Sequence, residues 1–278
     1  MNLKVIVPSL AILAVVSMGA WYLSSDINNE TAASSTDTNM IEVPAIVDTT
    51  NDLQLIKRTT EVIDEEPSEE MVKETPIKDK RPALAKVPSV LSESDIDFIQ
   101  AVQNLAPKLV TWMTPDQQIR KWVYIIDNIA DGNIPIQNRP LAYDMDKFQV
   151  DNSTEEGAFY LSGANFKRTE LLINTFTQIP PAELVRYYQH WLPLLNKAYD
   201  ELGRDDNFED RLIQAIENVL AIQSLNEKVA LKQPSVFYVY ANKDLEKADK
   251  LHKFFWRLGS KNTNKAQTYL KKIEPLIN

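Results

Sequence analysis

The strongest constraint on this chain is an uncharged apolar run close to its amino terminus. Residues 5–23 contain no charged side chain, and Lys4 stands immediately before them. A helix rises about 1.5 Å per residue, so a run of this length just crosses a hydrocarbon core of about 30 Å. Positive charge lies before the run, whereas Asp26 and Glu30 follow it. This asymmetry predicts a single transmembrane helix over residues 5–23, with residues 1–4 as a cytoplasmic stub and the remainder outside the cytoplasm.

A cleaved secretory signal peptide is the alternative interpretation of the same residues. The apolar part of a signal peptide usually spans about 7–15 residues and ends at a cleavage site of small residues. Residues 17–19 are the candidate site, but apolar residues continue past them and include Trp21 and Tyr22, which suit the aromatic belt of a membrane interface. We therefore expect an uncleaved signal anchor in the bacterial inner membrane, with the N-terminus cytoplasmic and the C-terminal domain periplasmic.

The composition changes after the apolar run. Residues 24–80 carry 14 acidic and 5 basic side chains, and their apolar residues follow neither a helical nor a strand period. Such a segment cannot bury enough surface to offset its ordering entropy, so we predict a disordered acidic linker over residues 24–83. The linker acts either as a solvated spacer or as the carrier of a specific acidic docking motif. The remaining residues sum to a charge near zero, which argues against a nucleic-acid partner.

Residues 84–278 are predicted to form a single all-α domain of about seven helices. Thr114-Pro115 is typical of a helix start, and Pro193 predicts a kink near Gln189 or two abutting helices. Residues 236–240 are β-branched and aromatic enough for a strand, but no partner strand is evident and a lone strand is not stable. The seven helices are indicated by apolar stripes at helical spacing, whose first residues are Ile96, Ile119, Leu171, Leu184, Phe208, Leu245 and Ala266.

Several short motifs of this domain resemble those of a bacterial family known as domain of unknown function 3014. The resemblance covers roughly residues 84–278, and Ile129, Phe166 and Leu258 stand where that family usually has Leu, Tyr and Met. Members of the family are similarly built from an anchor, a polar tether and this domain, and no activity is established for them, so the resemblance implies an architecture and no mechanism. In chain order the motifs are Val87–Asp95, Asp127–Gly132, Phe148-x-Val150, Asn165-Phe166-x-Arg168, Leu192–Gly203, Asp210–Ile213, Gln233–Val236 and Leu258-Gly259.

The chain offers little recognisable catalytic chemistry. It has no cysteine, and its two histidines, His190 and His252, lie in predicted helices without a nucleophile motif beside them. No zinc-binding His-Glu-x-x-His motif and no glycine-rich phosphate loop is present in the sequence. We predict no catalytic residue, no metal and no cofactor.

An acidic cluster between residues 200 and 210 could still carry chemistry. It does not fit a calcium-binding EF-hand, because Asp210 and Ile216 stand where that loop needs Gly and Glu. A glycosidase needs two carboxylates across a sugar-sized cleft, and Glu209 with Asp210 is the only candidate pair. Acidic residues at a helix start also favour the positive end of the helix dipole, so the cluster is interpreted as structural.

The other polar position of interest is Asp127, together with Asn128. It falls in the last turn of a strongly apolar helix, where a carboxylate is electrostatically disfavoured. The position predicts a cationic partner, either Arg168 or Arg211, within a structural ion pair or within a ligand site. The candidate binding residues are therefore Asp127, Asn128, Arg168, Tyr199, Asp210 and Arg211. Residues 243–278 also carry 9 basic and 4 acidic side chains among aromatics, which indicates a solvated basic face or a surface for anionic lipid or polymer.

The functional expectation from the sequence is a non-catalytic protein of the cell envelope. Residues 5–23 would hold it in the inner membrane, and the periplasmic domain would bind another envelope component, either a protein or peptidoglycan. The alternative is a cell-wall hydrolase that uses the carboxylate pair.

Overall fold

The computed structural model describes residue 84 and residues 86–152, 157–225 and 228–277. The predicted anchor and acidic linker therefore lie outside the described residues. Within the described ranges, no helix combines the length and the apolar content that a membrane span requires.

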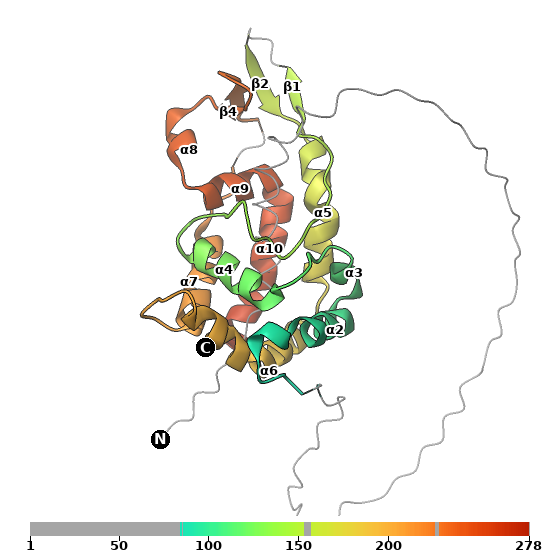
Figure 1. Cartoon of the computed structure of the whole chain (residues 1–278). Helices are drawn as coiled ribbons and strands as arrows, with labels where there is room; N and C mark the ends of the chain where they lie inside the picture. Colours follow the sequence, from blue (N-terminus) through green and yellow to red (C-terminus); the bar gives the residue numbers. More distant parts are fainter. Residues whose placement is uncertain (1–83, 85, 153–156, 226–227, 278) are drawn as a thin grey trace, which may run out of the picture. The chain divides into compact units, whose positions relative to one another are not determined.

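The described residues form nine α-helices, where about seven were expected (Figure 1). One additional helix is the short turn that begins at Pro107. The other arises because the helix predicted from Leu245 to Leu258 is divided at Ala248. Asp249 divides it, since its carboxylate accepts a hydrogen bond from the His252 amide at 2.7 Å and caps a new helix. The helices are α2 (Asp95–Leu105), α3 (Pro107–Val110), α4 (Gln118–Ala130), α5 (Ala164–Thr177), α6 (Pro181–Asp200), α7 (Phe208–Ala221), α8 (Lys243–Lys247), α9 (Lys250–Leu258) and α10 (Ser260–Ile273), with short 3₁₀ turns at Leu91–Glu93 and Glu274–Leu276.

Helix α4 is the centre of the hydrophobic core and packs on α6 and α7. The predicted apolar stripe is buried, as Trp122 and Ile126 illustrate, and Ile125 is buried as well because α4 has neighbours on more than one side. The expected start at Thr114-Pro115 is displaced to Gln118. A carboxylate from α2 explains the displacement, because Asp95 accepts hydrogen bonds from the Gln117 and Gln118 amides at 2.6 and 2.7 Å and caps α4 from outside.

Helix α6 runs through Pro193 as one continuous element, so the alternative of two abutting helices is wrong. Pro193 and Gln189 are both exposed. The backbone hydrogen bond that a proline removes from a helix interior therefore falls on the solvated side of α6, where water can replace it.

The prediction of a helical domain is confirmed in part: the described residues are mostly helical, but they also contain a four-stranded antiparallel sheet, so the domain is not all-α. The strands lie in chain order and form two hairpins, with Phe159 opposite Leu231 in the central pair. Tyr238 packs beside Phe148 and Phe159, with ring centroids 5.8 and 5.2 Å apart. Strands of two to four residues are too short to produce a detectable alternation, so the partners of the 236–240 run were not evident. The strands are β1 (Val150–Asn152), β2 (Ala158–Leu161), β3 (Ala230–Lys232) and β4 (Val239–Tyr240).

Candidate functional site

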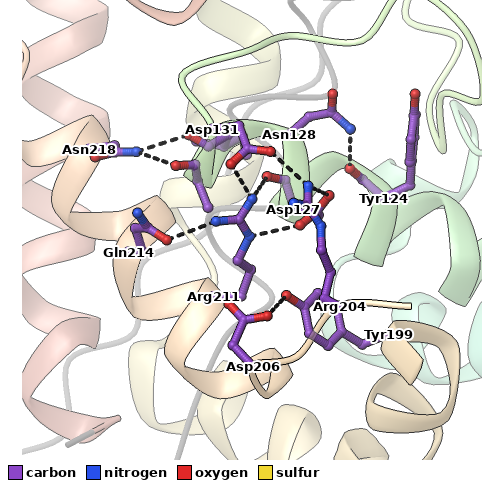
Figure 2. A network of polar contacts seen from close by, with 12 residues as sticks. Tyr124, Asp127, Asn128, Asp131, Tyr199, Arg204, Asp206, Arg211, Gln214 and Asn218 are labelled. Atoms are coloured by element: carbon purple, nitrogen blue, oxygen red, sulfur yellow. Dashed lines mark hydrogen bonds and ion pairs between the residues drawn. The ribbon is translucent and has the colours of Figure 1, made fainter. Parts of the chain in front are cut away.

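The predicted polar position Asp127 lies in the last turn of α4 and is only 5% exposed. Its neighbours Ile126 and Ile129 face the core, which fixes the carboxylate between α4, α7 and the loop that follows α6. One carboxylate oxygen accepts a hydrogen bond from Arg211 Nε at 2.7 Å, and the other accepts one from Arg204 Nη2 at 2.8 Å (Figure 2). Both oxygens of the buried acid are therefore paired with cations.

Arg211 reaches this position from the first turn of α7 and is 6% exposed. Its Nη2 also donates to the backbone carbonyl of Asp127 at 3.1 Å, and its Nη1 donates to Gln214 at 2.9 Å. On the next turns of α7, Asn218 donates to the carbonyls of Ile129 and Ala130 at 3.1 and 2.9 Å. The carbonyls of Asp127, Ile129 and Ala130 at the end of α4 thus gain partners on α7, whereas the Asn128 carbonyl accepts from the Asn133 amide at 2.8 Å.

Asp131 and Arg204 complete the cluster. Arg204 Nη2 bridges the Asp127 and Asp131 carboxylates at 2.8 Å each, and Arg211 also donates to Asp131. Burial tends to raise the pKa of Asp131, but the hydrogen bonds from Arg211 and Arg204 outweigh it and hold that pKa below its ordinary value. The pKa of Arg204 is raised by its hydrogen bonds to Asp127 and Asp131. Two carboxylates and two guanidinium groups balance in charge, which resolves the unfavourable placement of acids at a helix C-terminus.

Tyr199 lies beside this cluster on α6 and is 1% exposed. Its hydroxyl donates to Asp206 at 2.5 Å, and burial followed by this hydrogen bond raises the pKa of Tyr199, so the hydroxyl keeps its proton. Asp206 is therefore not an inert member of the acidic cluster, although it is exposed. Asn128 is half-buried at the edge of the site and donates to the Tyr124 carbonyl at 2.8 Å.

The structure brings together Asp127, Arg211 and Tyr199, with Asn128 at the margin, and leaves the other two predicted residues apart. Of the two cations proposed as partners of Asp127, Arg211 is the observed one. Arg168 lies on α5, where it donates to Asn165 at 3.2 Å.

Asp210 is exposed in the first turn of α7, where it exchanges hydrogen bonds with the N-cap residue Asn207. Its neighbour Glu209 is half-buried, and burial, together with the adjacent charge of Asp210, raises the pKa of Glu209. Both acids lie in the first turn of α7, as predicted for a structural role at a helix start.

Arg204 and Asp131 were missed. Neither belongs to an apolar stripe, and no sequence period connects a residue in the loop after α6 with the end of α4, more than 70 positions earlier. The only available signal was the acid–acid spacing of four residues between Asp127 and Asp131, which places both carboxylates over one helical turn.

The carboxylate–guanidinium cluster is a structural joint, that is, a set of ion pairs that connects secondary-structure elements. Each carboxylate oxygen of Asp127 has a guanidinium partner, and the cluster ties α4 to α7 and to the loop before α7. Among the residues that the structure describes, no group of three His, Cys, Asp or Glu side chains is placed to hold a metal ion.

Two hollows lie away from this joint. A cavity of about 450 Å³ is lined by Asp151, Tyr160, Phe166 and Lys228, beside the sheet. A groove of about 330 Å³ lies between the α2–α3 corner and α5, with Leu105, Lys108, Leu171, Thr175 and Ile179 among its lining residues. We call this second hollow the α3–α5 groove.

These features define a mainly helical domain with a small antiparallel sheet, in which an internal carboxylate–guanidinium cluster joins α4 to α7. The sequence pattern of the family described as protein of unknown function (DUF3014) matches residues 118–274, which is more than half of the chain. The chain belongs to this family, and the resemblance inferred from its motifs is confirmed. No curated protein and no solved structure matches the chain.

Proposed function

We propose that this protein is a membrane-tethered, non-catalytic binding module of the bacterial cell envelope. The predicted anchor over residues 5–23 would hold it in the inner membrane, and the linker would let the domain move over about 40 Å as a flexible coil. The conspicuous acids support a structural role, since Asp127 and Asp131 are neutralised internally.

The observation that carries the proposal is the α3–α5 groove. Leu171 is 50% exposed at its edge, next to the lining residues Leu105 and Ile179. A half-exposed leucine at the edge of a depression lined mainly by apolar side chains fits the apolar side chain of a protein partner. Lys108, 5.6 Å from the ring centroid of Trp112, adds a positive charge to the rim. Of the two partner classes expected from the sequence, the groove favours a protein over peptidoglycan.

Affinity capture from chemically crosslinked cell membranes tests this proposal. The full-length protein should capture a specific envelope protein, and Leu171→Glu should abolish the capture because it places a charge at the groove. Leu276→Glu is the matched control, since Leu276 is a comparably exposed leucine, 40% accessible, outside the groove. Equal capture by both variants and by the unmodified protein would contradict the assignment of the groove.

A cell-wall hydrolase is the second candidate, and the raised pKa of Glu209 is the observation that favours it. A carboxyl group with a raised pKa near a second carboxyl group is the arrangement of a glycosidase pair. The full-length protein would then release soluble fragments from purified peptidoglycan, and Glu209→Gln would abolish the release. We expect no release, because both acids occupy the first turn of α7 as helix-start residues.

A further inference from the structure

Beside the α3–α5 groove, α5 and α10 present a cluster of lysines. Glu170 on α5 accepts a hydrogen bond from Lys261 on α10 at 2.8 Å. That hydrogen bond and the charges of Lys261, Lys265 and Lys167 hold the pKa of Glu170 below its usual range, which places all three lysines around one carboxylate. Lys265 also donates to Asn174 of α5. One acid among three lysines leaves this surface with a net positive charge, and we call it the α5–α10 lysine cluster.

The lysine cluster borders the groove along α5. Lys167 lies one helical turn before Leu171, which lines the groove, so the two side chains are neighbours on the helix surface. Glu170 and Asn174 form the adjacent row, which faces α10. On the opposite rim stands Lys108 of α3. The groove is therefore an apolar depression with positive charge on both sides, and its complement is a segment that combines apolar and acidic side chains.

The linker of this same chain contains one such segment. Residues 61–72 carry six acidic side chains and no basic one, and they include Val62, Ile63, Met71 and Val72. We propose that residues 61–72 bind in the α3–α5 groove, with apolar side chains in the depression and carboxylates against the flanking lysines. The proposal assigns to this segment the role of the acidic docking motif that the sequence left as an alternative to a plain spacer.

The length of the intervening chain permits this contact. Residues 73–83 separate the segment from Leu84, and a fully extended chain of this length spans about 40 Å. The first described residues run along α6, where Lys197 donates to the Ser89 carbonyl at 2.9 Å. From there the 3₁₀ turn Leu91–Glu93 and α2 lead directly to α3, and the 11 residues of α2 extend about 16 Å.

The inference rests on the proposed function in one respect, because both proposals take the α3–α5 groove as a binding site for a protein segment. A segment on the same chain is present at an effective concentration in the millimolar range. Residues 61–72 would therefore compete with the envelope partner, and a partner would need either comparable acidic and apolar chemistry or higher affinity to displace them.

Crosslinking within the full-length protein tests the proposal, because the chain has no cysteine and two introduced thiols react without background. Ser68→Cys with Thr175→Cys places one thiol in the segment and one at the groove. The matched control pairs Ser68→Cys with Asn196→Cys, an exposed position on α6 next to the residue that holds Ser89. A freely moving linker would reach Asn196 at least as often as Thr175, whereas a docked segment should react with Thr175 at least about fivefold faster.

A second variant separates recognition from chance proximity without altering the described domain. Replacing Glu65, Glu66, Glu69 and Glu70 by Gln should lower the Thr175 reaction to the rate of the Asn196 control, and high salt should have the same effect on the unmodified segment. A Thr175 rate no higher than the control would overturn the proposal. A preference for Thr175 that survived neutralisation of the four acids would overturn it as well, since the lysines would then not recognise the segment.

The two proposals fail in distinguishable ways. Loss of partner capture in Leu171→Glu without preferential crosslinking would leave the groove as a site for foreign proteins alone. Preferential crosslinking without any captured partner would leave the groove as a site for the linker of this chain alone.

Discussion

Removing the carboxylate of Asp127 should destabilise the domain strongly. Asp127 is 5% exposed and is paired with Arg211, which is 6% exposed, so Asp127→Ala leaves a guanidinium buried with one of its two carboxylates missing. The second partner, Arg204, is 42% exposed at its side chain and loses less, because water can replace the lost contact.

The magnitude follows from these two environments. Truncating one partner of a buried ion pair typically costs about 3–5 kcal/mol. Arg211 keeps Asp131, Gln214 and the Asp127 backbone carbonyl as acceptors, which places the loss at the lower end of that range. We expect a decrease in the free energy of unfolding of about 3 kcal/mol, or a fall of roughly 1.5 M in the urea midpoint for a slope of about 2 kcal/mol per molar.

Urea denaturation of the full chain in mild detergent, followed by tryptophan fluorescence, measures this change, since Trp122 and Trp191 are buried in the domain. Asp205→Ala is the control, because it removes an exposed acid from the loop that carries Arg204, one of the two partners of Asp127. Equal urea midpoints for Asp127→Ala and Asp205→Ala would contradict a stabilising role of the Asp127 ion pair. If Asp127→Ala kept its stability but lost the captured partner, the cluster would be a binding site and not a joint.

Three further predictions concern other parts of the molecule. Gly259→Ala should destabilise the domain by about 3 kcal/mol, because Gly259 has a φ of 82° and an added Cβ would collide with the Phe166 ring. Gly203→Ala is the control in the same urea assay and should lose only about 1 kcal/mol, since nothing lies within 4 Å of its added Cβ. Burial raises the pKa of Asp131, but the hydrogen bonds from Arg211 and Arg204 outweigh burial, so the folded-state pKa is below the ordinary value. The carboxylate of Asp131 therefore stabilises the fold above the unfolded pKa of about 3.9, and this stabilisation is lost as the pH falls through the lowered folded pKa. The urea midpoint should therefore decline below about pH 4, and less steeply in Asp131→Asn. Residues 5–23 should remain uncleaved, with mass spectrometry finding the mature N-terminus ahead of this run and an alkaline-phosphatase fusion at the C-terminus active in the periplasm.

Sequence periodicity predicted the long helices because their apolar stripes repeat over three turns or more. The stripe through Trp122 and Ile126 in α4 is an example, and both residues are buried as expected. It could not predict the sheet, since β4 has two residues and β3 has three, which is less than one clear alternation. Periodicity also predicted one continuous helix across Ala248, where the structure has a break between α8 and α9. The break depends on the Asp249 side-chain cap, which the spacing of apolar residues does not reveal.

The site was predictable in part, for an electrostatic reason. An acid at a helix C-terminus requires a cation, and this argument correctly led from Asp127 to Arg211. The same argument could not exclude Arg168, because a pairing between distant residues is decided by tertiary packing. Arg204 carried no sequence signal, since it lies in a loop whose path is set by the packing of α6 and α7.

The motifs that carry the family resemblance contact one another in the structure. Asp127 of one motif pairs with Arg211 of another. The Asn165 side chain accepts from the Gln149 amide at 3.0 Å and donates to its carbonyl at 2.6 Å, which connects two further motifs. Gly259 faces the Phe166 ring so closely that no Cβ would fit between them.

These pairs explain why the family motifs indicate a shared fold and do not indicate a catalytic activity. Each joins elements that are distant in sequence, through an ion pair, a side-chain clamp on a strand end or a close backbone approach, and each is satisfied within the domain. By contrast, the α3–α5 groove is lined by Leu171 and Lys108, which lie outside every one of those motifs. Substitutions in the motif pairs should therefore act on stability, and substitutions at the groove should act on binding with the urea midpoint unchanged. Partner specificity in this protein is expected to depend on residues that the family signature does not contain.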